Sequence, residues 1–210
     1  MYELSSIVEL NEALAILITV VVLSLVFGSG YILRGDLALY AIITVIAVIG
    51  VIPHELAHRW CARKMGSYSR YVLSPIGLVL TLITAIPWIP FKIIMPGFTL
   101  VVPSRYEPNY LKRLNGLSGY IGPLTNIVIA SVSLATYALL VEVIAGLPWI
   151  VSTFLKLNSY INSWIAIFNL LPIPPLDGSK IWSWNPGVWI TTFLLGIGLY
   201  VVSGYLIGVF

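Results

Sequence analysis

The sequence predicts an all-α polytopic membrane protein with about six transmembrane or membrane-embedded segments. Of its 210 residues, 59% are hydrophobic and only 9% are charged, and the mean hydropathy is +0.99. A typical soluble domain carries about 25% charged residues, so one soluble core cannot bury this much apolar surface. We therefore expect lipid to cover much of the molecule, which makes it a multi-pass integral membrane protein.

Five apolar runs are long enough to cross a bilayer as helices. A membrane-spanning helix needs about 20 apolar residues, because the hydrocarbon core is about 30 Å thick. The runs cover residues 13–33, 37–60, 117–146, 149–172 and 187–209. No polar block of domain size separates or flanks them. We therefore expect a single membrane-embedded domain over residues 1–210, with a core at 37–180 and no soluble regulatory domain.

A sixth apolar stretch, residues 71–103, is interrupted by several helix-breaking residues. These are Pro75, Pro87, Pro90, Pro96 and Gly97. The stretch could form a helix near 74–89 with a returning extended segment, a re-entrant hairpin, or a single crossing. Irregular backbone at membrane depth survives only where protein or water satisfies its polar groups. The pattern favours a small irregular or β re-entrant element near 91–103.

The positions of the basic residues orient the segments. If 71–103 returns to the side from which it started, eight of the 11 Lys and Arg residues lie on one face. These eight are Arg59, Arg63, Lys64, Arg70, Arg105, Lys112, Arg113 and Lys180. A single crossing would divide them between the two faces. Because cytoplasmic loops are enriched in Lys and Arg, we favour the hairpin and a cytoplasmic location for this face. The net charge of +3 is small and scattered, so we expect no nucleic-acid partner.

The two histidines of the chain stand four residues apart in His54-Glu55-Leu56-Ala57-His58. Positions i and i+4 share one face of a helix, so both imidazoles can bind the same ion. Glu55 is placed to accept a proton from water as an acid/base catalyst. This spacing is the H-E-x-x-H signature of zinc hydrolases. Because the motif ends an apolar run, the site should lie within the membrane or at its edge.

A catalytic zinc site takes three protein ligands and leaves one position open, so a third ligand must come from elsewhere. Cys61 lies on a neighbouring helical face, and Glu142 lies towards the opposite side of the membrane. Other acids lie at segment ends or in loops, namely Glu3, Glu9, Glu12, Asp36 and Glu107. Asp177 follows the run 149–172 and falls on the same membrane face as the histidines if the basic residues are cytoplasmic. Because it lies on the same membrane face as the histidines, Asp177 is the preferred candidate for the third ligand.

Three motifs together resemble those of the site-2 protease family of intramembrane zinc metalloproteases. They are HELAHRWCARKMG at 54–66, GPLTN at 122–126 and NLLPIPPLDG at 169–178, in the order found in the family. The resemblance covers residues 37–180. It implies one Zn²⁺ per chain, bound by His54, His58 and Asp177. It also implies that Glu55 is the catalytic acid/base and that substrates are membrane-spanning segments of other proteins.

Asn126 and Asn169 are candidates for binding the substrate backbone or stabilising the oxyanion. An amide in a membrane helix can also simply bond to a neighbouring helix. Two other classes of function remain open at this point, namely a different membrane zinc hydrolase and a non-enzymatic protein, either a metal transporter or a catalytically inactive scaffold. A different membrane zinc hydrolase would normally carry another His or Glu motif for its third ligand. A metal transporter should carry ionisable residues through several helices, whereas here they concentrate at one level, which favours a single site.

Overall fold

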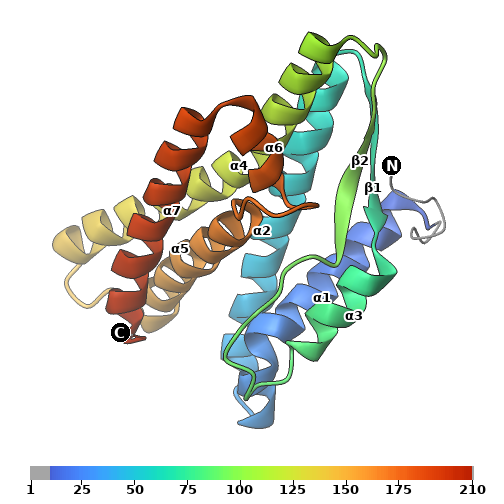
Figure 1. Ribbon diagram of the computed structural model, residues 1–210. Helices are drawn as coiled ribbons and strands as arrows, with labels where there is room; N and C mark the ends of the chain where they lie inside the picture. The colour runs from blue at the N-terminus through green and yellow to red at the C-terminus, as the bar shows by residue number, and fades with distance from the viewer. Residues whose placement is uncertain (1–9, 210) are drawn as a thin grey trace. The chain divides into compact units, whose positions relative to one another are not determined.

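The computed structural model describes residues 10–209. Two acids considered above as ligands, Glu3 and Glu9, lie outside the described residues. The chain forms two compact units, Met1–Glu107 and Pro108–Phe210. The first contains α1 (Glu12–Leu33), α2 (Leu37–Lys64), β1 (Tyr68–Leu73), α3 (Pro75–Ile83) and β2 (Gly97–Val102). The second contains α4 (Pro108–Val143), α5 (Trp149–Asn169), α6 (Asp177–Trp184) and α7 (Pro186–Ile207), as labelled in Figure 1.

The first unit is built on the helical hairpin of α1 and α2. Gly35 allows the tight turn between them, since its φ of +73° lies in the left-handed region that favours glycine. Asp36 caps α2 by accepting a hydrogen bond from the backbone N–H of Leu39 at 3.0 Å. The helices pack through buried apolar side chains, which include Leu23 and Ile43. The packing of α1 therefore supports the part of α2 that precedes the histidines.

The stretch 71–103 folds back on itself. β1 pairs with β2 in an antiparallel ladder that runs from Tyr68 opposite Val102 to Leu73 opposite Gly97. Residues 68 and 102 are therefore neighbours, which confirms the returning arrangement over the single crossing. The expected extended element near 91–103 is present as β2. Its partner strand β1 was not predicted, because six residues between a basic helix end and a proline give little periodic signal.

The helix inside this excursion is shorter than the expected span of about 74–89. Ser74 caps its start, and the helical pattern of α3 ends at Ile83. The ammonium group of Lys92 donates to the carbonyls of Thr84 and Ile86 at 2.8 and 3.2 Å, just beyond the helix end. These contacts satisfy two carbonyls of the irregular segment 84–96, and the backbone N–H of Met95 attaches the segment to α3 by donating to the Thr81 hydroxyl at 3.2 Å.

The second unit is held together by buried polar contacts as well as by apolar packing. α4 and α5 lie side by side through buried asparagine and serine side chains. α5 joins α7 through the hydroxyls of Ser159 and Ser203, which are 2.7 Å apart. The short helix α6 closes over the end of α5, where Leu170 and Ile181 are fully buried.

Within residues 10–209, four helices are long and apolar enough to cross a membrane, namely α1, α2, α4 and α7. The run 149–172 forms a helix of 21 residues as expected, but this helix, α5, is not one of the four. The reason lies in its composition, since α5 carries Lys156 and a cluster of buried polar side chains. The cluster comprises Asn158, Ser159, Asn162 and Ser163. The expectation of six segments is therefore supported for four.

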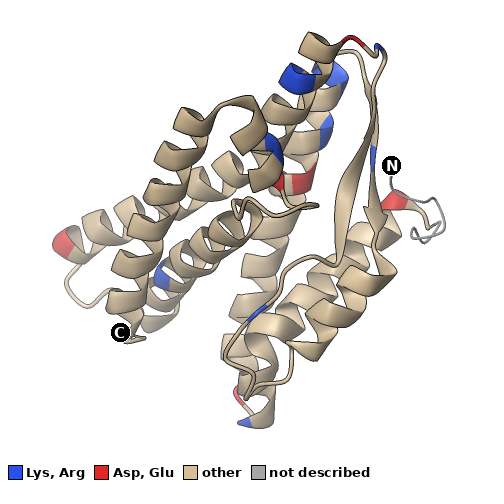
Figure 2. Cartoon of the chain, in the orientation of Figure 1, with Lys and Arg blue, Asp and Glu red and all other residues tan. Residues whose placement is uncertain are grey.

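Charged side chains gather near certain helix ends within each unit (Figure 2). In the first unit, Arg59, Arg63 and Lys64 lie at the C-terminal end of α2, whereas Arg34 precedes its N-terminal end. In the second unit, Lys112 and Arg113 lie near the start of α4. The long middle portions of these helices are apolar, as expected for segments in contact with lipid.

Gly178 should tolerate no side chain, which tests how α6 is seated. A Cβ added there would lie 2.0 Å from the carbonyl oxygen of Leu170 and 2.3 Å from its carbonyl carbon. The backbone of Leu170 cannot rotate out of the way as a flexible side chain can. Gly178→Ala should therefore destabilise the protein by about 1–3 kcal/mol. Thermal unfolding in detergent measures this, with Gly198→Ala on α7 as control, since no atom lies within 4 Å of a Cβ there. Equal unfolding temperatures for both variants would contradict the packing of α6.

Candidate metal centre

The H-E-x-x-H segment lies on α2, as the spacing predicts, and its two imidazoles converge. His54 and His58 are one helical turn apart and are 4% and 6% exposed. Their Nε2 atoms are 2.9 Å apart, and the rings meet edge to face at 77°. Two ring nitrogens at this distance must share a proton or a cation, because two facing lone pairs would repel. The two Nε2 atoms therefore point at one another, and an ion placed between them could be bound by both.

A zinc ion fits this arrangement. With Zn–N distances of about 2.0–2.1 Å and a tetrahedral angle, two ligand nitrogens are about 3.3 Å apart. The observed separation of 2.9 Å is close to this value, so only a small shift of the rings is needed. Buried neutral imidazoles are the ligands that zinc prefers in hydrolases. The histidine pair thus supplies two adjacent positions of a tetrahedral site.

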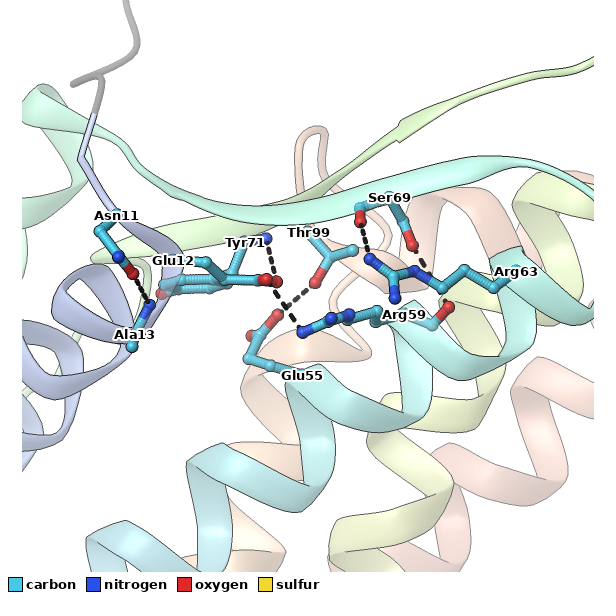
Figure 3. Close-up of polar contacts among 9 residues, drawn as sticks. All are labelled: Asn11, Glu12, Ala13, Glu55, Arg59, Arg63, Ser69, Tyr71 and Thr99. Carbon is cyan, nitrogen blue, oxygen red and sulfur yellow. Dashed lines mark hydrogen bonds and ion pairs between the residues drawn. The ribbon is translucent and has the colours of Figure 1, made fainter.

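Glu55 lies beside the histidines and is held by the two-stranded sheet. Its Oε2 accepts a hydrogen bond from the hydroxyl of Thr99 on β2 at 2.7 Å (Figure 3). The side chain is half-buried, so water can approach it more readily than it can approach the imidazoles. A carboxylate in this position can accept and return a proton.

A second acid, Glu12 at the start of α1, anchors the sheet to α2. Its Oε1 accepts from the backbone N–H of Tyr71 at 3.0 Å, and its Oε2 pairs with Arg59 at 2.9 Å. Figure 3 shows Glu55, Arg59 and Arg63 reaching from α2 towards the strands. From the sequence, Glu12 is only one of several acids at segment ends. No motif marks its role, because its partners are 47 and 59 residues away.

Tyr71 lies opposite Thr99 in the ladder and faces the same side of the sheet. Its hydroxyl is 2.8 Å from that of Thr19 on α1. Burial raises the pKa of Tyr71 well above its usual value, and the nearby charge of Glu55 raises this pKa further. The hydrogen bond with Thr19 lowers the pKa, but it does not offset these effects. The phenol therefore stays neutral at physiological pH and adds no negative charge beside Glu55.

Asp177 belongs to the second unit, where it begins α6 after a proline-rich turn. Its carboxylate is buried, and the residue is 6% exposed. Oδ1 accepts a hydrogen bond from Lys180 Nζ at 2.8 Å, three residues later on the same helical face. The close approach of Gly178 to the Leu170 carbonyl fixes where α6 begins. Asp177 is thus presented as a buried carboxylate with a defined orientation.

The two candidate asparagines have distinct environments in the second unit. Asn126 is fully buried on α4, and its Nδ2 donates to Oδ1 of Asn162 at 2.8 Å. Asn162 in turn donates to Asn158, which donates to Ser133. Asn169 donates to the carbonyl of Ile165 at 2.9 Å, within its own helix. Asn158 and Asn162 were not predicted as site residues, although amides four residues apart in an apolar helix are a signal in the sequence.

The first unit therefore brings His54, His58 and Glu55 together on one helix, with Thr99 beside the carboxylate. The second unit presents Asp177, Asn126 and Asn169 on three different helical segments. His54, His58, Asp177 and Asn126 are buried, whereas Glu55 and Asn169 are partly exposed.

Comparisons with known proteins agree with this chemistry. The chain is 34% identical to "Putative zinc metalloprotease MJ0611" of Methanocaldococcus jannaschii over 203 residues, 94% of this chain and 98% of the relative. It is 30% identical to "Putative zinc metalloprotease YwhC" of Bacillus subtilis over 154 residues, 68% of this chain and 67% of the relative. No protein-family model matches, and no solved structure does. The histidine pair, the adjacent glutamate and these relatives together show that the chain belongs to a family of zinc metalloproteases.

Proposed function

We propose that this protein is a zinc-dependent intramembrane endopeptidase of the site-2 protease family. It would hydrolyse peptide bonds within transmembrane segments of partner proteins, in regulated intramembrane proteolysis. One observation carries the proposal. The buried His54–His58 pair and Glu55 lie on α2, a helix that is itself long and apolar enough to cross a membrane. A protease whose metal ligands lie on such a helix acts most readily on substrates in the same bilayer.

We further propose that one zinc ion per chain is bound by His54 and His58 of the first unit and by Asp177 of the second. The chain has only two histidines, so the third ligand of a catalytic site has to be another residue type. Asp177 is a buried carboxylate with fixed orientation, and burial of a carboxylate is costly without a cationic partner. Lys180 supplies part of that compensation, and a metal ion would supply more.

The proposed mechanism assigns the proton transfers to Glu55. A bound zinc ion would act as a Lewis acid on the scissile carbonyl and would lower the pKa of water to about 7. Glu55 accepts a proton from the attacking water as the new carbon–oxygen bond forms. It then gives this proton to the departing amine as the carbon–nitrogen bond breaks, so the carboxylate is regenerated. Thr99 holds one oxygen of the carboxylate during both transfers.

The outer edge of β2 is our candidate for the surface that binds the substrate. Tyr71 N–H points away from β2 to Glu12, so the pair Tyr71–Thr99 does not exchange ladder hydrogen bonds. The backbone groups of Thr99 and Val101 therefore point outward, and no partner for them is present among residues 10–209. An unwound substrate segment could add to this edge as a further strand.

Asn126 and Asn169 remain candidates for binding the substrate backbone or the oxyanion. The hydrogen bonds to Asn162 and to the Ile165 carbonyl fix the orientation of the two amides, as a binding role requires. We also propose that the site opens towards the cytoplasm, because α2 has Arg59, Arg63 and Lys64 at the end that carries the histidines.

Removal of the metal tests the proposed function. We expect the purified protein in detergent to cleave a single-span reporter whose membrane segment contains a central Asn-Pro pair. Treatment with 1,10-phenanthroline should abolish cleavage, and added Zn²⁺ should restore it, because Glu55 alone cannot polarise the scissile carbonyl or lower the pKa of water as a bound metal ion would. The non-chelating isomer 1,7-phenanthroline is the control. Cleavage that persists after the zinc content has fallen to zero would refute the assignment.

A further inference from the structure

The hydroxyl of Thr99 contacts the Glu55 carboxylate directly. The Thr99 Oγ1 atom lies 2.7 Å from Oε2 of Glu55, a distance typical of a strong hydrogen bond to a charged acceptor. Among the described residues, Oε1 of Glu55 accepts no hydrogen bond. One oxygen is therefore fixed and the other is left for proton transfer.

The position of Thr99 is itself determined by several contacts. Thr99 stands opposite Tyr71 in the ladder, and Tyr71 is attached to α1 through its hydroxyl and its backbone N–H. Glu12 accepts that N–H and also binds Arg59, one helical turn after Glu55 on α2. On the same strand as Tyr71, Ser69 donates to the carbonyl of Arg59 at 3.2 Å. The sheet is thus attached to α2 on the same stretch of helix that carries the acid/base.

We infer that Thr99 is a positioning residue for Glu55 and that it links the acid/base to the strand edge at which substrate binds. This inference rests on the proposed function. The side chain of Thr99 reaches Glu55, while its backbone N–H and C=O point to the outer edge of β2. A substrate strand that pairs with this edge forms hydrogen bonds to the residue that holds the carboxylate. The register of the substrate and the position of Oε1 are therefore set by one residue.

Infrared spectroscopy and kinetics of two variants test the inference. Thr99→Val keeps the size and shape of the side chain but removes the donor, whereas Thr99→Ser keeps the donor. The difference between the spectra of the wild-type protein and Glu55→Gln identifies the carboxylate stretching band of Glu55. We expect this band to shift in Thr99→Val and to stay at the wild-type frequency in Thr99→Ser. This readout needs no substrate, and a merely structural role of Thr99 would not produce the pattern.

Cleavage of the Asn-Pro reporter supplies the second readout. Loss of a hydrogen bond to a charged group should lower kcat about 10- to 100-fold in Thr99→Val, with KM changed less than about threefold because the backbone edge is kept. Thr99→Ser should recover kcat to within about threefold of the wild type. Thr44→Val is the matched control, since among residues 10–209 the Thr44 hydroxyl bonds only to the Tyr40 carbonyl within α2.

Several outcomes would overturn the inference. They are an unshifted Glu55 band in Thr99→Val, a kcat equal to that of the wild type, or a Thr99→Ser variant as slow as Thr99→Val. A rise in KM alone would show that Thr99 serves only the strand. If the wild-type protein with zinc fails to cleave, the proposed function fails as well. If the wild type cleaves and Glu55→Gln does not, an active Thr99→Val overturns only the role of Thr99.

Discussion

Glu55→Gln should retain bound zinc and lose proteolysis. General acid–base catalysis contributes about 10²- to 10⁴-fold, so we expect cleavage of the reporter to fall by at least about 100-fold. The amide oxygen of Gln can still accept the hydrogen bond from Thr99, so the local packing should survive. Zinc content by atomic emission and cleavage by gel electrophoresis measure the two effects separately.

Glu142→Gln is the matched control, because this substitution makes the same chemical change on the exposed C-terminal part of α4. It should leave both zinc content and cleavage at wild-type values. Wild-type cleavage by Glu55→Gln would remove the acid/base role assigned to Glu55. Loss of zinc in that variant would instead show that Glu55 takes part in binding the metal.

Asp177→Asn should lose zinc as well as activity. The substitution replaces an anionic ligand with a neutral amide, and it leaves Lys180 without its carboxylate partner at 2.8 Å. Changes to residues that only support metal ligands cost about 10- to 100-fold in affinity, so loss of a ligand itself should cost more than about 100-fold. Titration with Zn²⁺ against a competing chelator measures this affinity.

Asp36→Asn makes the same chemical change at the N-cap of α2, where Asn caps as well as Asp does. This control should bind zinc with wild-type affinity. If Asp177→Asn also kept wild-type affinity, Asp177 would not be a ligand, and another carboxylate or Cys61 would have to complete the site.

The long helices and the histidine pair could be predicted from the sequence because both depend on local pattern. An apolar run of about 20 residues predicts a long helix, and a spacing of four places two residues on a shared helical face. The N-terminal limit of α2 was also predictable, since Leu37 begins both the apolar run and the helix.

The contacts around Glu55 could not be predicted, because they join residues far apart in the chain. Thr99 is 44 residues from Glu55, and Tyr71 is 59 residues from Glu12. Neither pair leaves a periodic signal. β1 forms through its pairing with β2. Its own sequence contains the charged Arg70 near the middle, which weakens the apolar pattern that would predict a strand. Such a strand forms because of its tertiary contacts rather than its local propensity.

The assignment of α5 shows a different limit. Its length and overall apolarity predict a membrane crossing, and this stays a prediction, since its asparagine and serine side chains pair with α4 and α7. Where several faces of a helix carry polar groups, neighbouring helices rather than lipid must surround most of that helix. The amino-acid composition of a sequence window does not show which face of a helix a polar residue occupies. The three-dimensional structure does show this.

The coordination of zinc in the purified protein tests the central claim most directly. X-ray absorption at the zinc edge should show one tightly bound ion per chain with two imidazole ligands and an additional oxygen ligand, all at about 2.0–2.2 Å. The oxygen contribution should decrease in Asp177→Asn. A sulfur ligand at about 2.3 Å, or a first shell with a single imidazole, would contradict a site formed by His54, His58 and Asp177.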